Sequence, residues 1–301
     1  MRFLVTGASG FVGSNVARQL AAEDKSAAVL LRPGGDRRRL AAILPKLTVI
    51  EGDLADIRAS GDAIAAFAPD VTLAIGWQGV KNTDRNDPLQ YDNIGGITEL
   101  MRLSYECGAR HFIGLGSQAE YGPCSGAIDE DVPARPTTLY GAAKLASAIL
   151  LERLAAIQGM RFAWLRLFSS YGPGDDPSWL IPFISRKLLQ GETPPLTAGE
   201  QIWDYIHVAD VAAAIIAAAE SEASGVFNLG SGQAVALRSL IEQVRDLIDP
   251  KLSLGFGQIP YRPDQVMHLE ANIAKLTATT GWRPKVRLAD GLAETVASYR
   301  V

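Results

Sequence analysis

Cysteine, histidine and surplus positive charge are all scarce in this sequence. The 301 residues include two cysteines, Cys107 and Cys124, which form no C-x-x-C pair, so a disulfide framework and a thiolate zinc site are both disfavoured. The three histidines show no metal-ligand spacing, and we expect no metal. Lys and Arg number 29 against 33 Asp and Glu, a net charge of -4 that gives no basic field for a nucleic acid. We therefore expect neither a metal nor a nucleic-acid partner, and a reducing cytoplasm fits best.

Long apolar runs are absent as well. A membrane-spanning helix needs roughly 20 apolar residues, whereas the Ala-rich stretch Val211 to Ala219 is short and is bounded by Asp210 and Glu220. The chain opens with a strand-like run, Arg2 to Thr6, in place of a basic and apolar leader. Hydrophobic residues make up 48% and charged residues 21%, which is a globular composition. We expect a cytoplasmic protein of about two domains with no membrane partner.

Short apolar runs recur along the chain at the length of β-strands. They are nearly continuous, as expected when both faces of a parallel sheet are covered, and they span 3–6, 27–31, 47–51, 71–75, 111–115 and 162–167. Helical periodicity fills several intervals between them, most clearly 12–23, 94–107 and 140–158. Right-handed crossovers would join the strands. The pattern predicts an α/β fold with a doubly wound parallel sheet.

The composition changes after residue 170. Two segments dense in turn residues, 171–177 and 192–195, mark a domain boundary there. We predict one domain over 1–170, to which 203–232 returns. The remaining segments, 171–202 and 233–301, are predicted to form a smaller mixed α/β domain.

Three glycines separate the first predicted strand from the first helix, in Thr-Gly-Ala-Ser-Gly-Phe-Val-Gly from Thr6 to Gly13. Without side chains the turn can tighten, and the backbone and helix N-terminus can approach a pyrophosphate. An ordinary tight turn is the alternative for a bare triple glycine, but the strand before it and the helix after it favour a Rossmann-type site. The predicted cofactor contacts in this turn are Gly7, Gly10, Phe11, Val12 and Gly13.

The residue that ends the second strand bears on the form of the cofactor. An acid there accepts a hydrogen bond from a free ribose 2′-hydroxyl, whereas an arginine pairs with a 2′-phosphate. This chain has Arg32, followed by Arg37 to Arg39 with Asp36 as the nearby acid, so NADP(H) is favoured and NAD(H) stays possible. A solvated basic helix start is the alternative interpretation. Asp53 and Leu54 are candidate adenine contacts, with a helix cap as the alternative for Asp53.

Tyr140 and Lys144 stand four residues apart at the start of a predicted helix, which places them on one face. A free phenol has a pKa of about 10 and exchanges protons poorly at neutral pH unless a nearby ammonium stabilises its phenolate. Lys144 is expected to supply that charge. Ser117, at the end of the fifth strand, is expected to hydrogen-bond the substrate oxygen while Tyr140 passes a proton as hydride moves. These three residues are the predicted catalytic set.

In these motifs the chain resembles an extended short-chain dehydrogenase/reductase of the sugar-nucleotide epimerase/dehydratase family, and the likeness covers nearly its whole length. The resemblance implies a nicotinamide dinucleotide on the N-terminal domain and a nucleoside-diphosphate hexose in the C-terminal part. The matching pieces are the glycine turn, Asn93 in Asn-Ile-Gly-Gly, Gly116 to Gly122, Tyr140 to Lys144, Arg166 to Pro173, Asp204 to Asp210, Phe227 to Gly232 and Gly281 to Pro284.

Departures from the family's patterns bear on the reaction. The 4,6-dehydratases have an Asp-Glu pair directly after the catalytic hydroxyl residue, whereas Gln118 and Ala119 stand there in this chain and neither titrates. The epimerase-reductases that make GDP-fucose have a Cys at the position of Ala119. Dehydration and ring-carbon deprotonation are therefore disfavoured, and reduction of a 4-keto sugar and 4-epimerisation remain.

Arg32 favours the reductase, because 4-epimerases usually retain NAD and show an acid at that position. The motifs around Ser117, Tyr140 and Trp203 look most like CDP-abequose synthase and related reductases. We therefore predict NADPH-dependent reduction of a nucleoside-diphosphate 4-keto-6-deoxyhexose at C4. The alternatives are an NAD-dependent sugar-nucleotide 4-epimerase and a non-catalytic NADP-binding regulatory sensor.

The substrate contacts follow from the same resemblance. Gln118 follows the catalytic serine, Ser169 replaces an Asn of many relatives, and Arg262 matches a diphosphate-binding position, with a loop salt bridge as its alternative. Trp179 is a candidate for stacking on a base or sugar, or else a core anchor. Helices 94–107 and 140–158 are apolar on more than one face, which predicts a homodimer as in relatives, although burial inside a monomer gives the same pattern.

Overall fold

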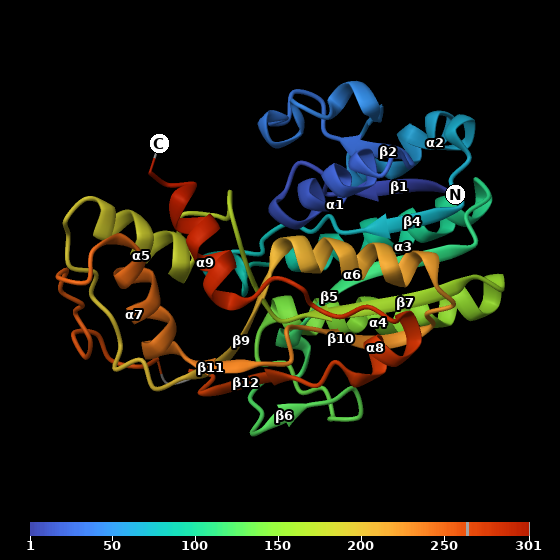
Figure 1. Ribbon diagram of the computed structural model, residues 1–301. Helices are drawn as coiled ribbons and strands as arrows, with labels where there is room; N and C mark the ends of the chain where they lie inside the picture. Colours follow the sequence, from blue (N-terminus) through green and yellow to red (C-terminus); the bar gives the residue numbers. More distant parts are fainter. Residues whose placement is uncertain (263–264, 301) are drawn as a thin grey trace.

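The computed structural model describes residues 1–262 and 265–300 and has two lobes of unequal size (Figure 1). Within those residues, a parallel sheet of seven strands in the order β10-β7-β5-β4-β1-β2-β3 forms the larger lobe. Its strands are β1 (Arg2–Thr6), β2 (Ser26–Leu31), β3 (Thr48–Glu51), β4 (Val71–Ala74), β5 (His111–Ser117), β7 (Arg161–Leu167) and β10 (Gly225–Leu229). The predicted parallel α/β fold is confirmed, and the strand order reverses between β1 and β4, where open sheets of this kind bind ligands.

Helices cover both faces of the sheet (Figure 1). On one face α1 (Phe11–Ala22) packs beside α6 (Val208–Glu220), and on the other α3 (Gln90–Glu106) packs beside α4 (Leu139–Gln158), with the short α2 (Gly61–Phe67) next to α3. Successive strand residues enter opposite cores, as Phe3 and Val5 do on the α1 side and Leu4 on the α3 side. Burial on both faces explains why the strands are continuous apolar runs. Among the described residues, no helix is long and apolar enough to cross a membrane.

The element bounds differ from the predicted ones where side chains or turns intervene. β5 extends to Ser117, two residues beyond the apolar run, so the serine stands at the very end of the strand. α3 begins at Gln90, ahead of the predicted start at 94, and the Gln90 side chain is buried. α4 ends at Gln158, and Gly159 after it adopts the left-handed conformation (φ +64°) that commonly terminates a helix.

The smaller lobe combines three helices with short strands. α5 (Leu180–Leu189), α7 (Leu237–Ile248) and α9 (Leu288–Ala297) share an apolar core of their own. A second sheet has the order β11-β9-β12-β6, with β8 paired to β9, and its strands are β6 (Ala127–Ile128), β8 (Ser169–Tyr171), β9 (Ile202–His207), β11 (Ala234–Ala236) and β12 (His268–Ala271). Residues after 233 therefore contribute strands as well as the expected helices and loops. β9 runs directly into α6, so the chain passes from the smaller lobe back to the larger one.

The remaining helical elements are short and lie mainly in the loops that follow the strands of the large sheet. They are the 3-10 helices η1 (Arg38–Leu40), η2 (Leu44–Lys46), η3 (Leu54–Ser60), η4 (Asn82–Asp84) and η5 (Gln118–Glu120), together with α8 (Ala274–Thr280), which contacts β10 and α6. Because η3, η4 and η5 follow the carboxyl ends of β3, β4 and β5, they lie at the edge of the sheet where the site forms.

Candidate active site

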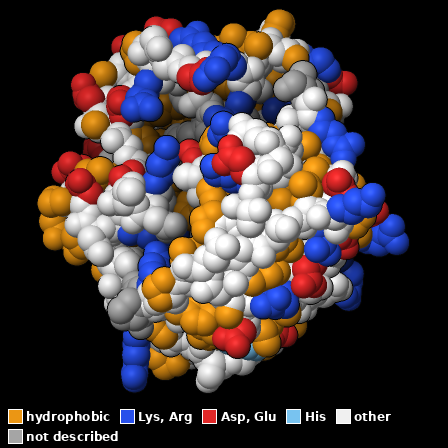
Figure 2. Space-filling view, turned by 90° about the vertical axis from the view of Figure 1, so that its left-hand side faces the viewer, with side chains coloured by type: hydrophobic (Ala, Val, Ile, Leu, Met, Phe, Trp, Pro, Cys, Tyr) orange, Lys and Arg blue, Asp and Glu red, His pale blue; other side chains and the backbone are white. Residues whose placement is uncertain are grey.

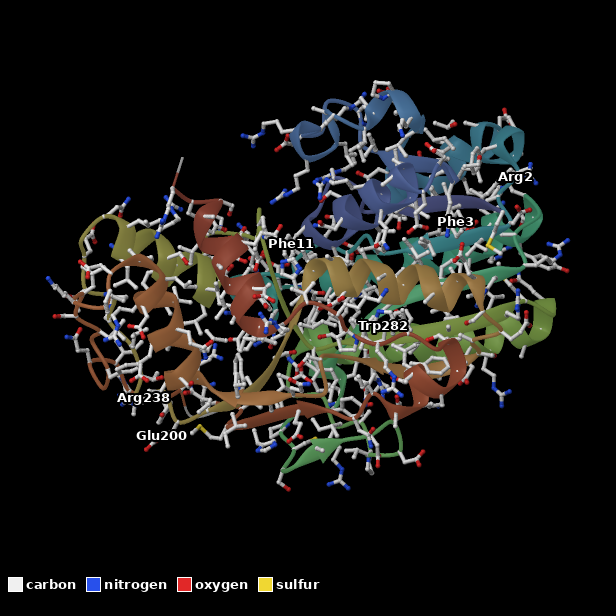
Figure 3. All side chains as sticks on the ribbon, in the orientation of Figure 1. Arg2, Phe3, Phe11, Glu200, Arg238 and Trp282 are labelled. Atoms are coloured by element: carbon white, nitrogen blue, oxygen red, sulfur yellow. The ribbon has the colours of Figure 1, made fainter. Side chains whose placement is uncertain are left out.

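A cavity of about 900 Å³ lies between the two lobes, and its size suits a small-molecule site. Figure 2 shows the molecule hollowed on this face, with Lys and Arg side chains around the opening. Phe11, labelled in Figure 3, marks the start of α1 at the junction of the lobes, whereas Glu200 and Arg238 lie on the smaller lobe away from it. All the predicted site residues line this cavity: Gly7, Gly10, Phe11, Val12, Gly13, Arg32, Asp53, Leu54, Ser117, Gln118, Tyr140, Lys144, Ser169, Trp179 and Arg262.

The glycine turn between β1 and α1 leaves no room for side chains. Gly7 has φ +70°, and a Cβ there would lie 2.6 Å from the backbone nitrogen of Gly76. A Cβ on Gly13 would overlap the carbonyl oxygen of Gly7. No side chain caps the start of α1 at Gly10, so the first N–H groups of that helix have no side-chain acceptor. The turn therefore fits the pyrophosphate of a dinucleotide.

The arginines after β2 fall into two groups: Arg37 and Arg38 bind carboxylates, whereas Arg32 and Arg39 line the cavity. Arg39 donates to the carbonyl oxygen of Gly174 at 2.7 Å. Arg37 pairs with Glu51 at 2.6 Å, and Arg38 pairs with Asp36 at 2.8 Å. The hydrogen bonds from Arg38 lower the pKa of Asp36 to about 2 and occupy both of its carboxylate oxygens. Arg32 faces the cavity, and among the described residues no acidic group forms an ion pair with it.

Asp53 combines the two roles that the sequence left open. Its carboxylate accepts a hydrogen bond from the Ala55 N–H at 3.1 Å and so caps η3, while Asp53 and Leu54 both line the cavity. The cap fixes the loop after β3. This loop forms part of the cavity wall, at the same edge of the sheet as Arg32.

Ser117, Tyr140 and Lys144 come together at the end of β5 and the first turns of α4. Thr138 caps α4 by accepting a hydrogen bond from Gly141 N–H at 3.1 Å. Tyr140 is 8% exposed and Lys144 is 3% exposed, so both functional groups are largely removed from water. Lys144 Nζ donates to the carbonyl oxygen of Leu115 at 2.6 Å, and Ser117 Oγ accepts from Ala119 N–H at 3.1 Å. Ser117 also forms a side-chain hydrogen bond with Tyr140.

Burial dominates the electrostatics of this group. Burial raises the pKa of Tyr140, and the groups that act to lower it are the Ser117 hydroxyl and the Arg85 guanidinium. Burial also lowers the pKa of Lys144 to about 7, although the Glu120 carboxylate opposes this effect. That Lys144 lowers the pKa of the phenol stays a prediction, and burial disfavours the ammonium that the prediction requires.

Trp77 and Arg85 adjoin the predicted catalytic set and were not identified from the sequence. The Trp77 ring centroid lies 3.9 Å from Lys144 Nζ, and the ring meets Tyr140 edge-on with centroids 6.3 Å apart. The Arg85 guanidinium carbon lies 5.2 Å from the Tyr140 ring centroid. Both residues belong to the loop between β4 and α3, which has no periodic pattern to draw attention to it.

Glu120 is a further residue whose importance the sequence did not reveal, although it stands within the matched run 116–122. Its side chain is fully buried and accepts hydrogen bonds from Ser117 N–H at 2.8 Å, Trp164 Nε1 at 2.9 Å and Arg166 Nε at 2.8 Å. Glu120 and Arg166 form a buried ion pair, and the Glu120 carboxylate also holds the backbone N–H of Ser117.

The smaller lobe supplies the other side of the cavity. Gln118, Ser169 and Arg262 line it together with two tryptophans. Trp179 is the residue before α5, and Trp203 in β9 donates from Nε1 to the Val266 carbonyl oxygen at 2.9 Å. This wall is therefore largely aromatic and apolar, with Arg262 as a cationic member.

A model of the NAD dependent epimerase/dehydratase family matches residues 3–230. The chain belongs to this family. Two curated relatives are a UDP-glucose 4-epimerase of Mycolicibacterium smegmatis, 28% identical over 100% of this chain and 99% of its own, and a dTDP-glucose 4,6-dehydratase of Actinoplanes sp., 27% identical over 100% and 98%. The expected membership of the extended short-chain dehydrogenase/reductase type is thereby confirmed, and the chain is an NAD(P)-dependent enzyme of that type.

Solved structures of the family agree with the fold over the full chain. The UDP-glucose 4-epimerase of Thermotoga maritima with UDP-glucose superimposes with a TM-score of 0.90 at 26% identity, covering 100% of this chain and 99% of that one. The UDP-glucose 4-epimerase of Thermus thermophilus in complex with NAD has a TM-score of 0.87 at 27% identity, with the same coverage. These likenesses extend across both lobes and the cavity between them.

Proposed function

We propose that this enzyme transfers hydride from NADPH to C4 of a nucleoside-diphosphate 4-keto-6-deoxyhexose, as a nucleotide-sugar 4-ketoreductase. The larger lobe would bind the dinucleotide at the glycine turn, and the smaller lobe would bind the sugar nucleotide. Support for a sugar-nucleotide substrate comes from the relatives, one of which has UDP-glucose bound. The catalytic set, Ser117, Tyr140 and Lys144, lines the same cavity as both proposed subsites.

The position of Arg32 is the observation that favours reduction over epimerisation. It faces the cavity at the end of β2, where its guanidinium would pair with a 2′-phosphate. The nearby acid that would instead favour NAD, Asp36, is held by Arg38. A reductase must exchange its cofactor at each turnover, and this arrangement favours the phosphorylated form that reductases commonly use.

The residues after Ser117 support the same choice by excluding dehydration. Gln118 lines the cavity at the start of η5, and Ala119 follows it. Eliminating water requires an acid and a base beside the sugar ring, and neither side chain titrates. The proposal therefore departs from the activity of the 4,6-dehydratase relatives.

In the proposed reaction the dinucleotide supplies the hydride, and this chain supplies proton transfer and positioning. Negative charge develops on the C4 oxygen of the sugar as hydride is transferred. The Tyr140 hydroxyl donates its proton to this oxygen, and the Ser117 hydroxyl donates a hydrogen bond to it. Lys144 would hydrogen-bond the cofactor's ribose in addition to Leu115. Arg262 would pair with the diphosphate, and Trp179 would pack against the base or sugar.

A 4-epimerase is the second candidate, because the relatives include UDP-glucose 4-epimerases that match the full chain. The same three residues serve both reactions. The two differ in cofactor use: an epimerase retains NAD and gives no net oxidation, whereas a reductase consumes NADPH stoichiometrically.

The decisive test is a panel of CDP-, dTDP-, GDP- and UDP-4-keto-6-deoxyhexoses assayed with NADPH and NADH on protein purified without added cofactor. The proposal expects NADPH consumption with one of the four and no retained NAD. In Arg32→Ala, the KM for NADPH should rise at least tenfold with little change for NADH, while the control Arg37→Ala, whose partner is Glu51, should keep its preference. Retained NAD with interconversion of sugars would establish the epimerase, and NADP binding without turnover would favour a sensor.

We also propose a homodimer through the face formed by α3 and α4. Large apolar side chains are exposed on these helices, with relative exposures of 58% for Tyr91, 56% for Ile149, 50% for Leu150 and 82% for Ile157. A partner helix pair would remove them from water. Sedimentation analysis tests this, and Ile157→Glu should give a monomer if the proposal holds.

A further inference from the structure

The loop between β4 and α3 carries an arginine directly above the ring of Tyr140. The guanidinium carbon of Arg85 lies 5.2 Å from the Tyr140 ring centroid. Arg85 is half-buried and lines the cavity, and its buried Nε has no hydrogen-bond partner within residues 1–262 and 265–300. A cation held against an aromatic ring at this distance stabilises negative charge that develops on it.

The backbone holds Arg85 in this position. Its carbonyl oxygen accepts a hydrogen bond from the N–H of Tyr140 at 2.8 Å, and the neighbouring Asn86 Oδ1 accepts from Leu139 N–H at 3.1 Å. Buried Gln90 fixes the other side of the loop by donating to the Gly79 carbonyl oxygen at 2.7 Å and the Asp84 carbonyl oxygen at 3.1 Å. The backbones of Arg85 and Tyr140 are therefore joined by a hydrogen bond, which keeps the two residues side by side.

Lys144 is placed differently with respect to the phenol. Its ammonium faces the Trp77 ring at 3.9 Å from the centroid and donates to Leu115. Burial lowers the pKa of Lys144 and so disfavours its ammonium form. Arg85 keeps its charge at neutral pH, although burial and the nearby charge of Arg262 lower its pKa.

We propose that Arg85 is a positioning residue that supports proton donation by Tyr140, acting through its charge above the phenol ring. This inference rests on the proposed function for the identity of the proton donor. The groups that act on Tyr140 are the Ser117 hydroxyl at the end of β5, the Arg85 guanidinium from the loop and the Glu120 carboxylate in η5, which opposes the other two. Arg85 is the cation among them that is fixed above the ring by the backbone.

The test compares Arg85→Gln, which removes the charge, with Arg85→Lys, which keeps it. Asn86→Ala is the matched control, because it loosens the same loop and helix start without changing charge. Tyrosines are replaced biosynthetically by difluorotyrosine, whose phenol ionises at lower pH, and the Tyr140 resonance is assigned by fluorine NMR through its loss in Tyr140→Phe. We expect the pKa of Tyr140 to rise by roughly 1 to 2 units in Arg85→Gln. The rise should be less than half as large in Arg85→Lys and in Asn86→Ala, because both keep the positive charge on the loop.

Turnover gives the second readout on the unlabelled enzyme. The protonated phenol is the donor in the reductive direction, so activity falls as pH rises through its pKa. In Arg85→Gln this falling limb should move to higher pH, and kcat should drop about tenfold because the acid is weaker, with the KM for the sugar nucleotide changed less than twofold.

Two outcomes would overturn the inference: an unmoved Tyr140 resonance in Arg85→Gln, or a rise in KM alone with an unmoved pH limb, which would assign Arg85 to substrate binding beside Arg262. Absence of turnover in the parent enzyme with every sugar nucleotide would instead refute the proposed function. The NMR titration tests the effect of Arg85 on the pKa of Tyr140 whether or not the enzyme turns over.

Discussion

Replacing Glu120 by alanine tests whether the ion pair beneath Ser117 holds the active site together. The Glu120 side chain is 0% exposed, and three donors converge on it, from Ser117, Trp164 and Arg166. Removing the carboxylate leaves the Arg166 guanidinium, itself 6% exposed, without its anionic partner. Breaking a buried pair on one side costs about 3 to 5 kcal/mol, because the remaining charge is uncompensated. This cost is a large part of the free energy of unfolding of an ordinary domain, which is roughly 5 to 15 kcal/mol.

Urea denaturation monitored by tryptophan fluorescence measures this loss. Glu242→Ala is the control, because Glu242 forms an exposed pair with Arg238 at 4.0 Å and its removal should cost less than about 0.5 kcal/mol. The double variant Glu120→Gln with Arg166→Met should recover more than half of the loss, since it removes both charges. A cost below about 1 kcal/mol for Glu120→Ala, or no recovery in the double variant, would show that the pair is not the structural support that we infer.

Three further predictions concern the glycine turn and the catalytic helix. Gly13→Ala should abolish dinucleotide binding, measured by calorimetry, because the added Cβ would overlap Gly7. The control is Gly95→Ala in α3, where a Cβ would meet open space. This variant should bind the dinucleotide normally and be more stable than the parent by about 0.5 to 1 kcal/mol. Tyr140→Phe should lower kcat by about 100-fold or more with cofactor affinity nearly unchanged; an equal rate would remove Tyr140 from the mechanism. The pKa of Lys144 is about 7 in the folded protein, whereas that of an unfolded lysine is about 10.4. Between these two pH values the unfolded state binds one more proton than the folded state. The free energy of unfolding should therefore rise with pH in this window, relative to that of Lys144→Met. Parallel curves for the two proteins over that window would contradict the lowered pKa.

Much of the fold and of the predicted catalytic set followed from local pattern. The continuous apolar runs 3–6 and 111–115 indicated strands buried on both faces, and the glycine spacing indicated a turn that side chains would block. The spacing of Tyr140 and Lys144 placed them on one helical face. Each of these inferences depends on backbone sterics or on the period of a strand or helix, which neighbouring residues set.

The surroundings of that set were not predictable in the same way. Glu120 and Arg166 are separated by 46 residues, and Leu139 and Asn86 by 53. Such pairs carry no mutual signal in one sequence, because only the packing of β5 against β7, and of the β4–α3 loop against α4, brings them together. The same reason accounts for Trp77, whose ring contacts the Lys144 ammonium and meets the Tyr140 ring edge-on.

The sequence by itself determined the fold class, the glycine turn and the identity of the residues that are predicted to exchange protons. Only the tertiary structure decided the charges these residues feel, and it placed Arg85, rather than the helical neighbour Lys144, above the phenol ring of Tyr140. The physical reason is that spacing along a helix fixes direction, whereas ionisation depends on burial and on every charge within a few ångströms, whichever segment supplies it.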